Sequence, residues 1–286
     1  MAAAVAAAVL GTGHVAALLG LSVFWPTLRW VLHKYTFEPL ARRMLKPTSL
    51  GPGAKPPPER SPAQQQLLIE KLCESLWKCM VYSAFCALGV AALWDQDWLR
   101  EGDTRQLWDG WPRHEFSPKM RALYDAELSF YFSSVFMLLF WEVRRKDFAV
   151  MFTHHLVTVG LLAASLANSF WRVGCVVMAL HDACDVLMEA AKVFNYTDRD
   201  AAATASFAGF LVSWAVLRLG ALPALVIRSA VRELPDALGG RPPMWWGFCG
   251  GLLLLLALHV YWFTLIVRVA WMRVVTGGGR DLREDD

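Results

Sequence analysis

The chain has 286 residues, of which 56% are hydrophobic and only 19% are charged, whereas soluble domains average roughly 45–50% and 25%. Its formal net charge of +3 gives no sign of the basic surface that nucleic-acid binding requires. These values exclude an ordinary soluble domain and a nucleic-acid-binding protein. They predict an all-α, polytopic membrane bundle.

Long apolar stretches recur along the whole chain. A helix needs about 20 mostly apolar residues to cross the hydrocarbon core of a bilayer. About seven stretches meet this requirement and are predicted to be transmembrane helices: 5–32, 76–94, 122–141, 149–170, 172–193, 204–227 and 244–271. The first is interpreted as an anchor, because it lacks the charged start and the short apolar core of a signal peptide.

The connections between these helices define the predicted domains. Residues 46–63 are rich in Pro and Gly, which predicts a flexible linker, and residues 228–243 are predicted to form a loop. The expected division is therefore an anchor and linker over 1–69, a membrane domain over 70–275 and a short charged tail over 276–286.

Lys and Arg are distributed unequally between the connections. If the C-terminus is cytosolic, the cytosolic flanks hold more Lys and Arg than the luminal flanks, in agreement with the positive-inside rule. Seven spans then place the N-terminus in the lumen. The Asn-x-Thr sequence at Asn195 falls on the cytosolic side, so no glycan is expected there.

Ionisable side chains occur inside two adjacent predicted spans, where each costs roughly 2.5–3.5 kcal/mol and usually has a function. The fourth span carries His154, His155 and Thr158 near its start. The fifth span carries a polar stripe, because residues three or four apart share one face of a helix. The stripe consists of His181, Asp182, Asp185, Glu189 and Lys192.

The polar groups of the two spans are predicted to meet. The spans form an antiparallel hairpin, and at about 1.5 Å per residue His154 and Asp185 fall at overlapping depths in the cytosolic half of the membrane. Neighbouring helical residues point about 100° apart. One of the two histidines is therefore expected to contact the substrate and the other to support it.

Other interpretations of this cluster stay open. The histidines would have a purely structural role if they only bridged helices through hydrogen bonds to Asp182 or Asp185. These two aspartates also have the spacing of a magnesium site, whereas a di-iron hydroxylase needs more clustered histidines than the chain has. A transporter would be expected to show internal repeats or broken helices.

The segment from Arg144 to Tyr196 resembles the Lag motif of ceramide synthases, within the TLC homology region. The similarity rests on the patterns RR-x-D-F, H-H-x-x-T, R-x-G, H-D-x-x-D and E-x-x-K. The matching residues are Arg144, Arg145, Asp147, Phe148, His154, His155, Thr158, Ser165, Asn168, Arg172, Gly174, His181, Asp182, Asp185, Glu189, Lys192 and Tyr196. A second stretch, WKCMVY at 77–82, resembles the sequence before the second span of that family.

The resemblance implies transfer of a fatty acyl group from acyl-CoA to the amine of a sphingoid base, such as sphinganine or phytosphingosine, in the endoplasmic reticulum membrane. A neutral imidazole suits this chemistry as general base or as nucleophile, and a carboxylate beside it would fix its tautomer. Catalysis is assigned to His154, His155, Asp182 and Asp185. Substrate-binding or supporting roles are assigned to His181, Glu189, Lys192, Thr158, Asn168, Arg144, Arg145 and Lys146.

The remaining expectations concern partners. No cofactor or metal is expected, because acyl-CoA is a substrate. Arg144, Arg145 and Lys146 could attract the phosphates of CoA, although positive-inside anchoring explains them as well. Membrane lipid and a second subunit, in a homo- or heterodimer, are the other partners considered, with no nucleic acid. The alternative function is a non-catalytic lipid-binding or lipid-sensing protein of the same fold.

Overall fold

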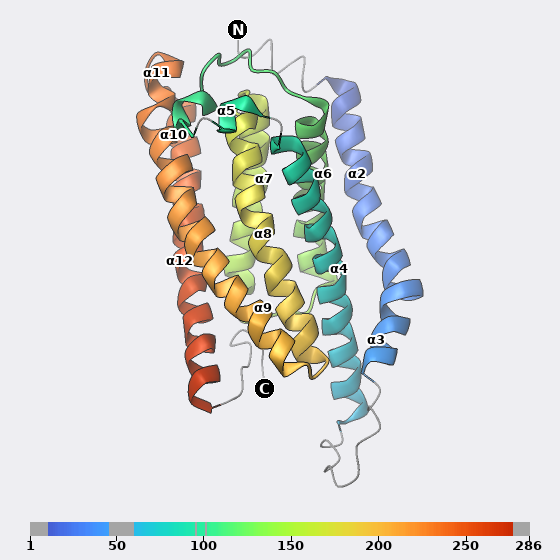
Figure 1. Ribbon diagram of the computed structural model, residues 1–286. Helices are drawn as coiled ribbons and strands as arrows, with labels where there is room; N and C mark the ends of the chain where they lie inside the picture. Colours follow the sequence, from blue (N-terminus) through green and yellow to red (C-terminus); the bar gives the residue numbers. More distant parts are fainter. Residues whose placement is uncertain (1–10, 46–59, 95, 101, 277–286) are drawn as a thin grey trace.

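The structure is a bundle of long helices that run roughly side by side (Figure 1). It is a computed structural model, and it describes residues 11–45, 60–94, 96–100 and 102–276. The described residues contain no strand. The predicted all-α class is therefore confirmed.

All of the secondary-structure elements in the described residues are helices. Five long helices are uninterrupted: α4 (Pro62–Leu93), α6 (Pro118–Phe140), α7 (Phe148–Ala167), α8 (Trp171–Tyr196) and α12 (Pro243–Thr276). The first long helix consists of α2 (Thr12–Leu32), η1 (His33–Phe37) and α3 (Glu38–Met44) in succession. The sixth consists of α9 (Asp200–Ser213), η3 (Trp214–Ile227) and α10 (Arg228–Arg232). Short helices lie in the connections: α5 (Asp97–Arg100), η2 (Thr104–Leu107) and α11 (Leu234–Leu238).

Six helices in the described part of the chain are long and apolar enough to cross a membrane. Helix α8 is not among them, because its ionisable stripe lowers its apolarity. It nevertheless has 26 residues and lies inside the bundle, packed against α4 and α9 (Figure 1). The chain is thus a multi-pass membrane protein, and the least apolar of its long helices is the one that carries the polar stripe.

The predicted start of the second span is wrong. Helix α4 begins at Pro62, because Ser61 accepts a hydrogen bond from the amide of Gln64 and the Gln64 side chain bonds back to the amide of Ser61. The helix therefore crosses the predicted domain boundary at residue 69. Of the predicted linker, residues 46–59 lie outside the described residues.

The predicted loop over 228–243 is also wrong, because most of it is helical. The sixth long helix continues through α10 as far as Arg232, and α11 follows. Gly239 ends α11 in the left-handed conformation, with φ of 69°. The predicted tail from 277 onward lies outside the described residues.

Helices α7 and α8 form the predicted antiparallel hairpin. We call the end of the bundle at which α7 begins the Asp147 end, and the end at which it finishes the Asn168 end. Near the Asp147 end, α8, α9, η3 and α12 enclose a small core. It consists of Cys184, Phe210, Trp214, Trp262 and Ile266. This core forms one side of the site described next.

Candidate active site

A cavity of about 310 Å³ lies among the long helices toward the Asp147 end, within the size range of small-molecule sites. The ionisable groups in its wall come from α7, α8, η3 and α12. They are His154, His155, Asp185, Lys192, Arg218 and Arg273, and Tyr82, Tyr131, Trp214 and Trp262 are among the aromatic residues of the wall. The cavity thus brings both predicted histidines together with one predicted catalytic carboxylate.

The two histidines have different surroundings. Their ring centroids are 5.7 Å apart. His155 is buried beside Tyr131, at 5.9 Å between ring centroids, whereas His154 stands edge-on to Trp262 at 5.2 Å. His154 also lines a second cavity of about 50 Å³, whose wall includes Ser165 near the Asn168 end of α7. His154 is therefore the histidine that both cavities share.

In the described residues, none of His154, His155 and His181 pairs with a carboxylate, so the expected pairing at the site is not present. Asp185 instead forms an ion pair with Arg218, at 2.7 Å between nitrogen and oxygen. Arg218 also donates a hydrogen bond of 2.8 Å to the carbonyl of His181. The ring of His181 is oriented by its Nδ1, which donates to the carbonyl of Val177 at 2.6 Å. Arg218 therefore fixes Asp185 in the cavity wall.

Arg218 is held in place by its own surroundings. It is buried, and its guanidinium lies 4.2 Å from the ring centroid of Trp214. It belongs to η3, a π-helical stretch that contains Pro223. Proline cannot donate to the helical hydrogen-bond ladder, and π-helical segments often mark functional sites. The π-helical segment therefore carries Arg218, the cation that pairs with Asp185.

Three ionisable residues of this region had no predicted role: Glu127, Arg218 and His259. The ring of His259 lies 4.8 Å from that of His181 and 6.3 Å from that of His154, so four histidines gather where three were expected. Each of the three lies inside an apolar span, which is the signal that identified His154. No group of three or more His, Cys, Asp or Glu in the described residues could hold a metal ion.

The other predicted residues of α7 and α8 lie in four different places. Thr158 lines the smaller cavity. Lys192 lines the larger one and pairs with Glu189 at 2.8 Å. Asp182 is fully buried and interacts with Glu127 of α6. Asn168 is not at the site. Its side chain donates to the carbonyl of Ala164, and it ends α7 far along the helix from His154.

The three basic residues before α7 do not act as one group. Arg145 is committed to Glu74, at 2.8 Å. Arg144 and Lys146 are exposed, and the guanidinium of Arg144 lies 4.0 Å from the ring centroid of Phe148. In the cavity wall itself, the cations besides Arg218 are Lys192 and Arg273.

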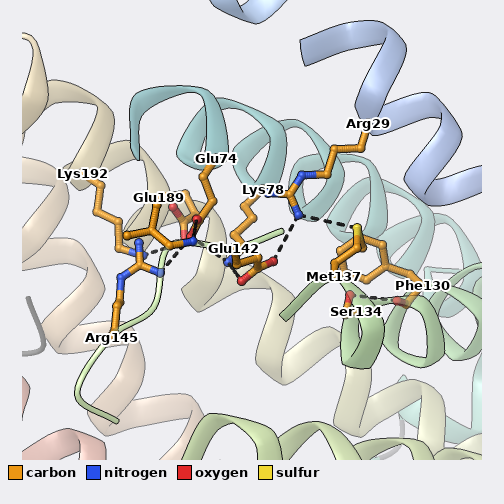
Figure 2. Close-up of polar contacts among 11 residues, drawn as sticks. Arg29, Glu74, Lys78, Phe130, Ser134, Met137, Glu142, Arg145, Glu189 and Lys192 are labelled. Atoms are coloured by element: carbon orange, nitrogen blue, oxygen red, sulfur yellow. Dashed lines mark hydrogen bonds and ion pairs between the residues drawn. The ribbon is translucent and has the colours of Figure 1, made fainter. Parts of the chain in front are cut away.

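A network of buried charges holds the connection before α7 in place (Figure 2). Glu142 pairs with Arg29 at 3.3 Å and with Lys78 at 2.8 Å, and Lys78 also pairs with Glu74 at 3.1 Å. Burial by itself raises the pKa of Glu142, but Lys78 and Arg29 more than offset this, so its pKa lies below the usual range. Glu74 also forms an ion pair with Arg145. The network thus links α2 and α4 to the start of the helix that carries the histidines.

Comparison with known proteins defines the class of this chain. The family model described as TLC domain matches residues 71–268, and the chain belongs to that family. It is 38% identical to ceramide synthase LOH2 of Arabidopsis thaliana over 264 residues, which cover 90% of this chain and 86% of that protein. It is 33% identical to ceramide synthase 1 LOH3 of the same plant (92% and 88% covered) and 37% identical to human ceramide synthase 5 (76% and 55% covered).

Proposed function

We propose that this protein is a ceramide synthase, an N-acyltransferase that transfers a fatty acyl group from acyl-CoA to the amine of a sphingoid base. Membership of the TLC domain family and the names of the relatives support this activity. The observation that carries the proposal is the position of His154, where the two cavities meet inside a membrane bundle. A reacting imidazole between a wide cavity and a narrow one, both lined by polar and apolar side chains, suits two substrates that each have a polar head and a long tail.

The charges around the larger cavity support binding of acyl-CoA at its outer part. Lys192 and Arg273 lie in its wall toward the Asp147 end, and the exposed Arg144 precedes α7 at the same end. Cations at this place attract phosphate groups. The apolar side chains deeper in the wall suit the hydrocarbon chains of both substrates.

His154 is the residue proposed to act at the acyl carbon. As a general base, its neutral imidazole removes a proton from the amine while the C–N bond forms and the C–S bond of the thioester breaks, and it then returns that proton to the CoA thiolate. As a nucleophile, it would take the acyl group first, as the C–S bond breaks and the CoA thiolate leaves, and the amine would then displace the imidazole to form the amide. Both routes need His154, and both need the adjacent His155 and the Arg218–Asp185 pair to keep the wall in place.

The proposed setting is the endoplasmic reticulum membrane, with the Asp147 end in the cytosol, where acyl-CoA is available. The C-terminal end of α12 lies at that end of the bundle, and α2 begins at the other (Figure 1). The reaction requires no cofactor besides its two substrates.

The test is an assay of membranes that contain the protein, with labelled sphinganine and a panel of acyl-CoAs. Wild type should form ceramide. We expect His154→Ala and His155→Ala to lower turnover at least about 100-fold, which is the usual size of a general acid–base contribution. Asp182→Asn and Asp185→Asn should also be severely impaired.

The matched control is Thr153→Ala. Thr153 precedes the histidines on α7 but is exposed and bonds only to its own helix, so this variant should keep full activity. Full turnover in both single histidine variants would refute the assigned chemistry. A wild-type protein that binds sphinganine but forms no ceramide would favour the lipid-sensing alternative.

A further inference from the structure

Two buried carboxyl groups differ from the others in their partners. Most buried acidic side chains in the described ranges meet a cation or an N–H donor. These are Glu74 with Lys78 and Arg145, Asp185 with Arg218, Glu189 with Lys192, and Asp147 with the indole of Trp262. Within the same described ranges, Glu127 and Asp182 have no basic side chain as a partner. A carboxylate in a low-dielectric interior is costly without a compensating positive charge.

Glu127 and Asp182 face each other from α6 and α8, and their carboxyl groups interact. Glu127 is 1% exposed and Asp182 is 0% exposed. Apart from the interaction of the two carboxyl groups with each other, Oε1 of Glu127 and both carboxyl oxygens of Asp182 are buried without a hydrogen-bond partner among the described residues. This pair can therefore bind a positive donor.

Glu127 lies in the wall of the smaller cavity, which His154 also lines. Thr158 and His181 line the same cavity. Thr158 Oγ1, His154 Nδ1 and His181 Nε2 are also buried without a hydrogen-bond partner among the described residues. Much of the remaining wall is apolar, with Leu161, Leu252 and Leu255 among its members. One side of the cavity thus concentrates polar atoms that are costly to leave unpaired.

We propose that Glu127, backed by Asp182, binds the ammonium group of the sphingoid base and accepts its first proton. This inference rests on the proposed function. The substrate amine is a cation at neutral pH, and it must become neutral before its lone pair can attack. A buried carboxylate pair without a basic partner suits both tasks, because it favours the cation on entry and holds the proton afterwards.

The proton balance of the reaction is complete with this residue. The ammonium transfers one proton to the carboxylate of Glu127 and becomes a neutral amine. The amine nitrogen forms the amide bond, the C–S bond breaks, and the second proton moves through His154 to the CoA thiolate. Ceramide and CoA leave, and the proton on Glu127 is released to solvent before the next turnover. Thr158 and His181 are placed to bond the hydroxyl groups of the sphingoid head.

The test separates binding of the base from binding of acyl-CoA. Glu127→Gln should raise KM for sphinganine, or lower kcat/KM for it, by about 10-fold or more, the size of one lost charge-assisted hydrogen bond. KM for acyl-CoA should change less than about 2-fold. Glu127→Asp, which keeps the charge, should recover part of the loss. Asp125→Asn is the matched control, because Asp125 lies on the same helix but pairs with His14 instead.

Parallel rises in both KM values, or unchanged sphinganine kinetics in Glu127→Gln, would overturn the inference. A second measurement uses only wild-type protein and does not depend on turnover. Wild-type protein should bind N,N-dimethylsphinganine, which keeps the positive charge, at least about 10-fold more tightly than a neutral analogue with a hydroxyl in place of the amine. Equal binding of the two would overturn the proposal, whereas absence of ceramide synthesis with intact preference for the cation would refute only the proposed function.

Discussion

At the scale of single residues, Gly174 shows how closely the helices approach near the second cavity. Gly174 lies on α8 in the wall of that cavity, opposite Tyr124 of α6. The hydroxyl of Tyr124 is buried and bonds to Ser165 Oγ at 3.0 Å. A Cβ atom at position 174 would overlap the Tyr124 hydroxyl. The glycine of the R-x-G pattern therefore has a packing reason that spacing in the sequence does not reveal.

We expect Gly174→Ala to destabilise the protein by about 1–3 kcal/mol, which is the usual cost of overpacking a well-filled interior. The measurement is the thermal unfolding midpoint in detergent. Gly160→Ala on α7 is the matched control, because no atom lies within 4 Å of the added Cβ there. A helical Gly→Ala change without a clash should be neutral or stabilising. Equal midpoints for the two variants would contradict the packing argument.

At the scale of elements, the buried charge network joins helices that are far apart in the sequence. Arg29 of α2 and Lys78 of α4 both reach Glu142, which lies in the connection between α6 and α7 (Figure 2). Lys78 and Glu142 are 17% and 6% exposed in their side chains. Because the network fixes the connection that leads into α7, it also fixes where the histidines lie along the bundle.

Removing Lys78 from this network should be costly, because Glu74 and Glu142 each lose one of their two buried cationic partners. We expect Lys78→Met to lower stability by about 1.5–3 kcal/mol, the size of a lost hydrogen bond between charged groups. Arg42→Gln removes the ion pair with Glu38 on α3, which is of the same i, i+4 type as Lys78–Glu74. Because the side chains of Arg42 and Glu38 are 52% and 32% exposed, this loss should cost only about 0–1 kcal/mol. Unfolding of both variants in detergent measures the difference, and a similarly small loss for Lys78→Met would mean that the network does not hold the connection.

At the scale of the whole molecule, the long helices alternate in direction, so each connection lies at one end or the other (Figure 1). The Asn195 sequon lies at the Asp147 end, at the end of α8, and Asn195 is exposed. A glycan can be added to this exposed side chain only if the Asp147 end lies in the lumen.

We expect no glycan on Asn195, because N-glycosylation occurs in the lumen and the Asp147 end is proposed to be cytosolic. The measurement is a glycosidase-sensitive shift on a gel. Gly102→Asn is the matched control, because it creates a sequon with Thr104 at the Asn168 end, where residue 102 is exposed and its positive φ of 70° is tolerated by Asn. A glycan on wild type that is lost in Asn195→Gln would reverse the orientation and place the Asp147 end, toward which the cavity lies, away from cytosolic acyl-CoA.

The sequence by itself determined the class of fold, the hairpin of α7 and α8, and the shared depth of His154 and Asp185. Each of these follows from local quantities, namely apolar length, helical period and rise per residue. The choice of partners was decided only by the tertiary structure. Arg218 forms an ion pair with Asp185, and Asp182 interacts with Glu127. These pairings arise because contacts between helices depend on their relative rotation and register. The spacing of residues within one helix does not fix either quantity.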